Sequence, residues 1–597
     1  VACNLRYIYI PIPITYTHMA ENKYPIETIR HSTAHVLAQA VKELFPETKL
    51  GIGPNVENGF YYDFDRETPF SPEDLKKLED RMRRHIKAAE KFEKIEYSEA
   101  EARKILKDEP YKIELMNDLI KEGEKPTFYK HGNFIDLCRG PHVNSTTDIK
   151  AFSLTKISSA YWRGDQNNKQ LQRIYGLAFH TKEELDAYVK RIEEAAKRDH
   201  TVLGQQMEIY STHAEVGAGL VHWHPNGAII RMEIENFWKA EHLKKGYKYV
   251  YTPHIGNLGL WKTSGHWNFY RESMYSPMKI DEIEYLVKPM NCPFHIFIYK
   301  TKLHSYRELP LRYAELGTVY RYEKSGVLHG MTRVRGFTQD DAHILCTPEQ
   351  LESEIIGVLE LSLFMLQTFG YKEYVIELSV RDPSNKEKYL GEDAVWNKAE
   401  GALKEALNIK KLKYRVGEGE AKFYGPSIDI KTVDALGREW QGPTIQVDFN
   451  LPEKFDVTYE GQDGKKHRPV MVHRTVLGSM ERFIGCLIEH YAGRFPLWLS
   501  PVQVKILTIS DRSNKFAEEL CAELLDNGVR AEIDTRAETL PKKVREAQVE
   551  QVPKIIIIGD KEVEAKTLAV RTLDGKTKYD VKQQEFIEEV LKEIKEK

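Results

Sequence analysis

Three residues that can bind a metal, Cys292, His343 and His473, lie far apart in the sequence. A thiolate and two imidazoles are ligands that zinc prefers, and three protein ligands leave a coordination position free for a small molecule. An open zinc can hold an amine and a hydroxyl group of one molecule together. For each residue alone, a buried cysteine or a hydrogen-bonded histidine without metal is the better interpretation. The sequence motifs around the three residues must therefore show whether they form a metal site.

A second group of such residues lies near the start of the chain. His31 and His35 are four residues apart, which places two imidazoles on one face of a helix. Cys138 and His142 have the same spacing, and Asp136 lies close to them in the sequence. These residues could bind a second zinc ion. They could equally act as general bases on a water molecule.

The composition limits the class of protein. A chain of 597 residues predicts about three or four domains. It is 41% hydrophobic and 30% charged, and no apolar run is long enough for a membrane span. The net charge of -3 argues against a protein that coats nucleic acid through bulk charge, although a local basic face can still bind RNA. Six scattered cysteines indicate a reducing compartment, so we expect a cytoplasmic protein without membrane association.

The spacing of apolar residues predicts an α+β multidomain protein. Residues 1–18 are expected to be a disordered or mis-assigned extension, because Met19 is a more natural start. A first domain over 19–205 ends in a connecting helix, and 206–497 mixes helices and strands without regular alternation, which favours an antiparallel sheet. Alternating strands and helices predict a doubly wound α/β domain over 498–597. We expect helices over 28–45, 71–84, 181–204, 227–245, 514–525 and 542–550, strand and turn over 118–140, and strands over 51–65, 282–287, 445–449, 502–507, 531–533 and 554–558.

Two segments of the second domain are suited to a nucleotide. Arg321 and Glu323 alternate in a predicted strand, so they would point the same way and could bind a phosphate and an adenine amino group. For an isolated pair, an ordinary ion pair is the favoured alternative. Further along, Gly478 and Ser479 precede an apolar helix with Arg482 in its first turn, an arrangement that suits a polyphosphate.

In a third segment, the helix expected over 227–245 is followed by a strand and then by Pro253. Together the three segments resemble the signature motifs of class II aminoacyl-tRNA synthetases. The segments 264–267, 288–293, 424–426 and 473–474 (Ser-Gly-His-Trp, Lys-Pro-Met-Asn-Cys-Pro, Tyr-Gly-Pro and His-Arg) resemble bacterial threonyl-tRNA synthetases, and the resemblance runs from about Met19 to the C-terminus. It implies a class II antiparallel-sheet core, an α+β editing domain and a C-terminal α/β anticodon-binding domain.

The resemblance implies a homodimer that uses ATP with Mg²⁺ to activate L-threonine and transfers it to tRNA(Thr). One zinc ion per subunit would be bound by Cys292, His343 and His473 and would hold the amino and hydroxyl groups of threonine. Arg321, Arg482 and His266 would be catalytic. The implied ATP contacts are Arg321, Glu323, Arg333, Phe337, Gln446, Ser479 and Arg482, and the implied threonine contacts are Met290, Gln339, Asp341, Tyr424 and Gln441.

A zinc ion that requires a hydroxyl group rejects valine but not serine. The missing methyl group is worth only about 1–3 kcal/mol, so a second, hydrolytic site is expected. The resemblance assigns this editing of seryl-tRNA(Thr) to His31, His35, Lys112, Asp136, Cys138 and His142. A second zinc ion there is the alternative. We favour hydrolysis without metal, because general bases and a positioned water can cleave a ribose ester.

The last domain resembles an anticodon-binding module in which Arg536, Glu562 and Arg571 could read bases, although solvated charges are an alternative. Some positions depart from the family pattern. Ala537 stands in place of an anticodon-contacting Asn, Ser427 in place of a common Lys, and residues 441–444 read Gln-Gly-Pro-Thr. The small domain that usually precedes the editing domain is also expected to be absent.

Two alternative functions must be compared with that of a threonyl-tRNA synthetase. A synthetase for proline or serine should not need the zinc triad together with this editing domain. A catalytically silent paralogue that binds RNA as a regulator should have lost Arg321, Arg482 or Cys292, and all three are present. A regulatory role as a second activity remains compatible with the sequence.

Overall fold

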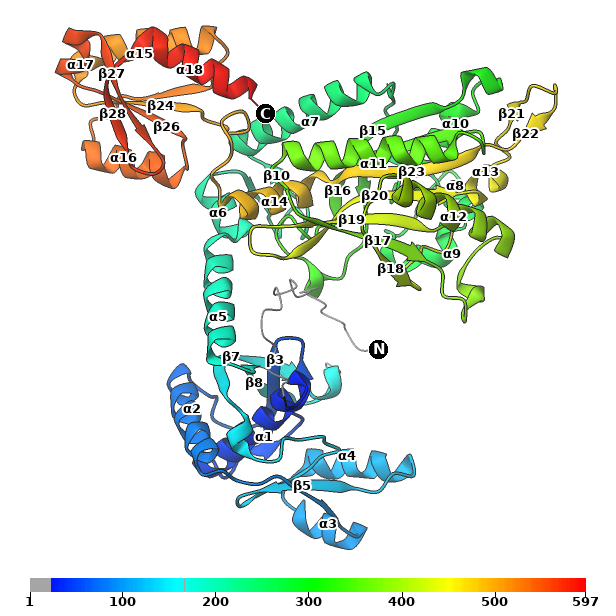
Figure 1. Cartoon of the computed structure of the whole chain (residues 1–597), viewed down its shortest axis with the longest axis vertical. Coiled ribbons are helices and arrows are strands. Elements are labelled where there is room, and N and C mark those ends of the chain that lie inside the picture. Colours follow the sequence, from blue (N-terminus) through cyan, green and yellow to red (C-terminus); the bar gives the residue numbers. More distant parts are fainter. Residues whose placement is uncertain (1–22, 166, 597) are drawn as a thin grey trace. The chain divides into compact units, whose positions relative to one another are not determined.

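The computed structural model describes residues 23–165 and 167–596. The expected extension over 1–18 lies outside the described residues. The chain divides into two compact units, Val1–Glu194 and Ala195–Lys597, which are described separately (Figure 1). The α+β multidomain architecture expected from the sequence is confirmed.

The first unit is built around helix α1 (Ile26–Leu44). Every residue from Thr28 to Val41 is buried except His31, which is half-buried. A helix that is buried on nearly all sides needs few charged residues, which fits its run of Ala, Val and Leu. The other elements up to the unit boundary are β1 (Lys49–Leu50), β2 (Asn55–Val56), β3 (Gly59–Asp65), α2 (Pro72–Lys87), β4 (Glu93–Glu96), α3 (Glu99–Ile105), α4 (Pro110–Lys121), β5 (Thr127–His131), β6 (Phe134–Leu137), β7 (Ala151–Tyr161), β8 (Gln170–Phe179) and α5 (Lys182–Lys197).

The first unit also contains two antiparallel sheets, and α1 packs on the first of them. One has the order β1-β3-β8-β7, with β2 paired to β3, and the other has the order β4-β5-β6. Helix α1 packs on β3 and β8, and α2 packs on β7. The second sheet ends at Leu137, so the next residue, Cys138, follows directly from a strand.

The second unit contains an eight-stranded sheet with the order β11-β15-β16-β23-β20-β19-β17-β18. Its strands are antiparallel except at the two ends, where β11 pairs with β15 and β17 with β18 in parallel. The antiparallel prediction is thus confirmed for the centre of the sheet. Its strands are β11 (Lys248–Tyr249), β15 (Leu311–Tyr320), β16 (Gly336–Cys346), β17 (Tyr374–Val380), β18 (Arg415–Glu418), β19 (Ser427–Val433), β20 (Glu439–Asp448) and β23 (Val470–Ser479).

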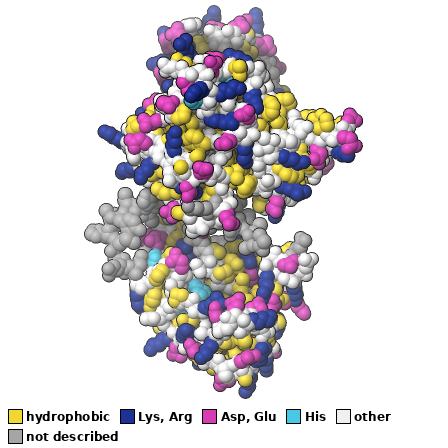
Figure 2. All heavy atoms as spheres, turned by 90° about the vertical axis from the view of Figure 1, so that its right-hand side faces the viewer, with side chains coloured by type: hydrophobic (Ala, Val, Ile, Leu, Met, Phe, Trp, Pro, Cys, Tyr) yellow, Lys and Arg dark blue, Asp and Glu magenta, His cyan; other side chains and the backbone are white. Residues whose placement is uncertain are grey.

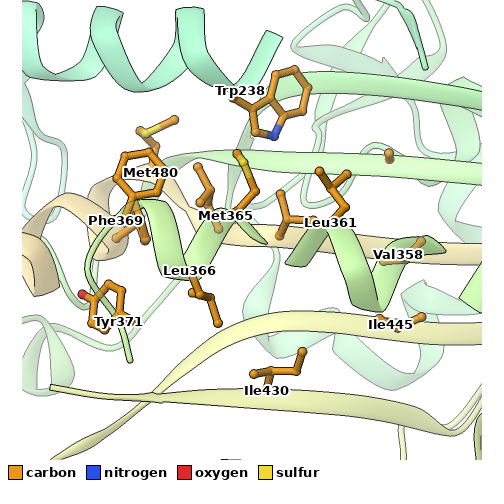
Figure 3. Close-up of a cluster of buried hydrophobic side chains, with 14 of the residues drawn as sticks. Trp238, Val358, Leu361, Met365, Leu366, Phe369, Tyr371, Ile430, Ile445 and Met480 are labelled. Carbon is orange, nitrogen blue, oxygen red and sulfur yellow. The ribbon is translucent and has the colours of Figure 1, made fainter. Parts of the chain in front are cut away.

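Helices and short strands flank this sheet. The remaining elements before residue 500 are α6 (His200–Gln206), β9 (Tyr210–Ser211), β10 (His222–Trp223), α7 (Pro225–Lys244), β12 (Ile255–Asn257), α8 (Gly259–Ser264), α9 (His266–Tyr270), β13 (Met278–Ile280), β14 (Ile283–Val287), α10 (Cys292–Tyr299), α11 (Leu351–Thr368), α12 (Asp393–Ile409), α13 (Asn450–Lys454), β21 (Tyr459–Glu460), β22 (Lys466–His467) and α14 (Met480–Tyr491). Figure 3 shows side chains of α11, Leu361, Met365 and Leu366, in the apolar layer beside the sheet strands.

Phe369, which follows α11, supports a stability prediction. Its side chain has 0% exposure and its ring lies 5.0 to 5.7 Å from those of Phe237, Phe483 and Trp498. Phe369→Ala should lower the free energy of unfolding of this unit by about 3–5 kcal/mol, because a cavity remains. Chemical denaturation measures the loss. Phe364→Ala is the matched control, since Phe364 is 43% exposed, and an equal loss in both variants would contradict the prediction.

The C-terminal domain differs from the doubly wound prediction. Strands β24, β25 and β26 are parallel, as expected, but β27 and β28 extend the sheet antiparallel, in the order β25-β24-β26-β27-β28. No helix separates β27 from β28, so these two strands form an antiparallel hairpin in place of a crossover connection. The elements are β24 (Val504–Thr508), α15 (Asn514–Asp526), β25 (Ala531–Asp534), α16 (Leu540–Val549), β26 (Lys554–Ile558), α17 (Asp560–Ala565), β27 (Thr567–Thr572), β28 (Thr577–Lys582) and α18 (Gln583–Lys595).

Two predicted elements were wrong in detail. The single connecting helix over 181–204 is two helices, because Asp199 has an extended backbone (ψ 121°) and caps α6 by accepting from the amide of Thr201. The strand and turn segment over 118–140 begins inside α4, which runs to Lys121. Among the described residues, no helix combines the length and apolarity needed to cross a membrane. Figure 2 shows basic and acidic side chains interspersed on the face in view, in keeping with the small net charge.

Candidate functional site

The structure brings Cys292, His343 and His473 together in the second unit. Their ligand atoms lie within 4.8 Å of one another. Cys292 is the first residue of α10, while His343 on β16 and His473 on β23 are directly paired across the sheet. All three side chains are buried. The spacing in the sequence gave no hint of this pairing, which the antiparallel sheet creates.

Each histidine has a buried partner within hydrogen-bond distance of one ring nitrogen, and the second nitrogen of His343, Nε2, lies 3.7 Å from the Asp341 carboxylate. His343 Nδ1 lies 2.8 Å from Nδ1 of His295, whose Nε2 lies 3.1 Å from a carboxylate oxygen of Glu315. His473 Nε2 lies 2.9 Å from Asp448. Carboxylates behind histidines fix the ring orientation of metal ligands in this manner. These supporting residues were missed from the sequence, although the three-residue spacing of Cys292 and His295 on one helix could have indicated His295.

The donor set fits zinc. Burial raises the pKa of the Cys292 thiol well above its usual range, and the carboxylates of Asp341 and Asp448 raise it further. A cation would therefore have to displace the thiol proton on binding, as zinc does at cysteine ligands. Burial lowers the pKa of His343 well below its ordinary value, so the imidazole is neutral and able to coordinate. One sulfur and two nitrogens leave room for a small molecule.

Strand β16 carries four of the predicted site residues at alternate positions. Phe337, Gln339, Asp341 and His343 share one face of the strand, because successive strand side chains point to opposite sides. Asp341 accepts a hydrogen bond from the Asn291 side chain at 3.2 Å. The nucleotide-binding and metal-binding candidates thus lie along a single strand.

The opposite face of β16 shapes the bulged end of strand β23 over residues 476–478, which is called the glycine turn below. The pairing of β16 with β23 jumps from Asp341↔Thr475 to Gln339↔Ser479, so Val476, Leu477 and Gly478 have no partner in the ladder. Their three backbone N–H groups donate to the carboxylate of Asp340 instead, at 2.7 to 3.0 Å. Gly478 has φ +85°, which favours glycine. Asp340 therefore anchors this glycine turn.

Three arginines come together near the turn. Arg482 lies in the first turn of α14, where Ser479 caps the helix, as the sequence predicted. Burial lowers the pKa of Arg482, and the nearby positive charges of Arg333 and Arg321 lower it further. Arg321 lies over the ring of Phe337 at 5.2 Å, and Arg333 pairs with Glu323 at 3.4 Å. Three arginines with Glu323 as a neighbouring carboxylate leave a net positive charge at the N-terminus of a helix, which suits a polyphosphate.

The strand prediction for Arg321 and Glu323 was wrong. Strand β15 ends at Tyr320, and the backbone N–H of Glu323 donates to the carbonyl of Arg321 at 3.0 Å. This tight turn ends the extended run, so strand alternation does not orient the two side chains. They still share a neighbourhood with Arg333 and Arg482.

Three predicted threonine contacts (Tyr424, Gln441 and Met290) and one predicted ATP contact (Gln446) lie at different places in the second unit. Tyr424 lies 5.6 Å from the His473 ring and 5.4 Å from the His266 ring. Gln446 is directly paired with His473, and its amide donates to the carbonyl of Gly425. Gln441 is exposed and donates to Asp429, and Met290 precedes α10 in a half-buried position.

His266 is a neutral imidazole whose tautomer is fixed by its neighbours. Ser264 Oγ lies 3.2 Å from the carbonyl of Trp261, to which it donates, and so accepts from His266 Nδ1 at 2.8 Å. His266 Nε2 therefore carries the lone pair. Burial lowers the pKa of His266 to about 3, with help from the positive charge of Lys454. Lys454, which donates to the Ser264 carbonyl at 3.2 Å, was missed from the sequence.

The first unit brings the second group together. The ligand atoms of His31, His35, Cys138 and His142 lie within 4.8 Å of one another. The Cys138 sulfur lies 3.3 Å from His31 Nε2 and 3.2 Å from His142 Nε2. Burial raises the pKa of Cys138 to about 12 and lowers the pKa values of the three histidines. The group is therefore a protonated thiol among neutral imidazoles.

A charged group stands beside this cluster in the same unit. Lys112 donates to the Asp136 carboxylate at 2.8 Å, and the Tyr62 hydroxyl donates to the same oxygen at 2.6 Å. The other oxygen of Asp136 is buried without a partner. Tyr62 was missed from the sequence, because its place on β3 gives no local sign of a contact with β6.

The three anticodon candidates lie on separate elements of the C-terminal domain. Arg536, after β25, donates to Asp534 and Glu546 at 2.6 to 2.9 Å. Glu562 caps α17 by accepting from the Gly559 amide, and Arg571 lies on β27. Arg536 and Glu562 already have intramolecular partners, so binding of a base would have to compete with these contacts.

Comparisons with known families match all three regions. Residues 275–491 match the "tRNA synthetase class II core domain (G, H, P, S and T)" and 503–593 match an "Anticodon binding domain". Residues 127–175 match the "Threonyl and Alanyl tRNA synthetase second additional domain". Together with the antiparallel core and the arginines at its glycine turn, these matches define a class II aminoacyl-tRNA synthetase.

Curated relatives narrow the class further. A threonine--tRNA ligase of Dehalococcoides mccartyi (strain CBDB1) is 56% identical over 550 residues, covering 92% of this chain and 94% of that protein. One of Magnetococcus marinus is 51% identical over 570 residues, covering 95% and 87%. The chain belongs to the threonine--tRNA ligase family, which confirms the resemblance inferred from the motifs.

Two solved structures agree with this assignment. A crystal structure described as the RNA binding domain of threonyl-tRNA synthetase from Cryptosporidium parvum Iowa II has a TM-score of 0.62 and 37% identity, covering 66% of this chain and 97% of that chain. A putative threonyl-tRNA synthetase from Aeropyrum pernix has a TM-score of 0.59 and 31% identity, covering 67% and 96%.

Proposed function

We propose that this chain activates L-threonine with ATP, in the presence of Mg²⁺, and transfers it to tRNA(Thr). The observation that carries the proposal is the cluster of Cys292, His343 and His473 at the end of a strand whose other end lies beside Arg321 and Arg482. The strand thus joins a site suited to an amine and a hydroxyl with a site suited to phosphates. One zinc ion per chain, when bound, would supply the open coordination position.

The proposed chemistry uses the chain's own residues as follows. Arg321 and Arg482 neutralise phosphate charge while the threonine carboxylate attacks the α-phosphate, which forms threonyl-adenylate and releases pyrophosphate. Glu323, Arg333, Phe337 and Ser479 position the nucleotide. Asp341 accepts from the substrate amine. In the transfer step His266, neutral at pH 7, accepts the proton of the tRNA ribose hydroxyl at Nε2 while that oxygen bonds to the threonyl carbonyl carbon and AMP leaves.

We further propose that the His31, His35, Cys138 and His142 cluster, with Lys112, Asp136 and Tyr62, hydrolyses seryl-tRNA(Thr). The neutral imidazoles can accept a proton from water, and the buried lysine can hold the substrate's carbonyl or phosphate. A second candidate is a metal site, because the four ligand atoms lie close enough together to bind one ion. Counting the metal ions bound per chain distinguishes the two.

The remaining proposals concern the context of the protein. We assign editing to residues 19–205, catalysis to 206–497 and anticodon binding to 498–597, with Arg536, Glu562 and Arg571 as base contacts. A homodimer in the cytoplasm is proposed, and the exposed apolar side chains of Tyr251, Ile255, Ile280 and Ile283 support a subunit interface. Light scattering tests the dimer.

An ATP–pyrophosphate exchange assay tests the central proposal. We expect exchange with threonine and weaker exchange with serine, because both carry an amine and a hydroxyl group. Valine and proline should give none, because neither has a hydroxyl for the open position. Exchange with proline exceeding that with threonine would reject the proposal.

A further inference from the structure

His200 is a fully buried histidine that the proposed chemistry does not use. It is the first residue of α6, which lies beside α14 in the second unit (Figure 1). Its exposure is 0%. Its Nδ1 lies 2.6 Å from a carboxylate oxygen of Glu489, and its Nε2 lies 3.0 Å from the backbone nitrogen of Met331. Both ring nitrogens therefore have partners.

The neighbours of the ring define where its proton lies. A backbone N–H can only donate, so His200 Nε2 accepts from Met331 and Nδ1 carries the proton that is donated to Glu489. Glu489 is only 4% exposed and also pairs with Arg438. Asp199, His200 and Glu489 include metal-ligand types, but these hydrogen bonds occupy both nitrogens of the ring. The cluster thus holds a backbone segment in place.

The held segment is a tight turn next to the three arginines. His329 and Arg333 exchange backbone hydrogen bonds at 3.1 Å, which leaves residues 330–332 as the turn. The carbonyl of Thr332 accepts from Arg482 Nε at 3.1 Å. The turn is therefore anchored at two neighbouring residues, by His200 at Met331 and by Arg482 at Thr332.

Gly330 shows how closely the turn approaches the ring. It has φ +45°, and a Cβ atom there would lie 2.2 Å from His200 Nε2. A side chain at this position would push the turn away from the histidine. Met331 is itself fully buried, so its N–H would lose its partner without reaching water.

We propose that His200 is a positioning residue that fixes the turn over 329–333 and so holds Arg333 where the outer phosphates of ATP bind. The inference rests on the proposed function, because it deepens the assignment of Arg333. Removing the acceptor leaves the buried Met331 N–H unpaired, and the turn shifts to regain a hydrogen bond. Arg333 moves with the turn, while the threonine contacts on β16 stay in place.

Two substitutions at His200 separate its two hydrogen bonds. His200→Gln can place an oxygen near the Nε2 position and keep the acceptor for Met331, whereas His200→Asn reaches only the Nδ1 position and keeps the contact with Glu489. We expect His200→Asn to raise the KM for ATP about tenfold, with an unchanged KM for threonine. His200→Gln should stay within about twofold of the wild type. Gly330→Ala should raise the KM for ATP in the same way.

Amide hydrogen exchange of the full-length chain gives a readout that does not need activity. The Met331 amide should exchange faster in His200→Asn and Gly330→Ala, but not in His200→Gln. His467→Asn, at an exposed histidine paired with Asp463, is the control. Equal effects of Asn and Gln at position 200, or KM values for ATP and threonine that rise together, would overturn the inference. A wild type without threonine-dependent exchange would instead reject the proposed function, and Met331 protection would still test the role of His200.

Discussion

Replacing Cys292 with serine should abolish threonine-dependent ATP–pyrophosphate exchange, with a fall of at least about a hundredfold. The zinc content should drop from one ion per chain to none, because a serine hydroxyl is a poor substitute for a thiolate between two imidazoles. Elemental analysis and the exchange assay on the same preparation measure both effects.

Cys521→Ser is the matched control for this experiment. Cys521 is also buried, but it lies in the C-terminal domain, where its sulfur contacts only the carbonyl of Ala531 among the hydrogen-bond partners described. This variant should keep one zinc ion and full exchange. A Cys292→Ser protein with normal zinc content, or with normal exchange, would contradict the assignment of the metal site.

Replacing His31 and His35 together with alanine should leave threonylation unchanged and slow the hydrolysis of seryl-tRNA(Thr) by at least about a hundredfold. The two imidazoles come from one face of α1 in the first unit, whereas the zinc candidates belong to the second unit. Deacylation of seryl-tRNA measures the loss, and mischarged tRNA should accumulate when serine is supplied.

His180→Ala is the control, since His180 lies in the same unit but outside the cluster. Unchanged deacylation in the double variant would reject the editing assignment. Cys138→Ser distinguishes the metal alternative. We expect it to retain the same zinc content as the wild type, and a loss of one ion would instead make the cluster a second metal site.

The sequence predicted the members of both clusters but not the residues that orient them. Cys292, His343 and His473 stand in recognisable motifs, and His31 and His35 have a spacing that reveals a helix face. Asp448 on β20 contacts His473 directly, and Glu315 on β15 contacts His295 of α10, which in turn contacts His343. No local sequence pattern indicates these contacts between distant segments. The family resemblance suggested roles for individual residues, whereas their hydrogen-bond partners could be identified only from the structure.

The wrong predictions have local causes. The prediction of one helix over 181–204 did not take account of Asp199. Its side chain caps a new helix, α6, so the first helix does not continue. The strand expected through Glu323 ignored the turn that follows Tyr320. In the C-terminal domain, strands and helices alternate as in a parallel sheet up to α17, but the next strand, β27, pairs antiparallel with β26 and forms a hairpin with β28. Each error arose where a short-range hydrogen bond or turn overrode a longer pattern.

Strand β16 sets the distance between the two groups of candidate site residues. Phe337, beside the arginines, and His343, in the metal cluster, are six residues apart, which corresponds to about 20 Å along a strand. Inserting or deleting one residue between them would turn the side chains beyond that point to the opposite face. The same change would misplace Asp340 and its glycine turn. As related sequences diverge, this strand can therefore tolerate amino-acid substitutions far more readily than the insertion or deletion of a residue.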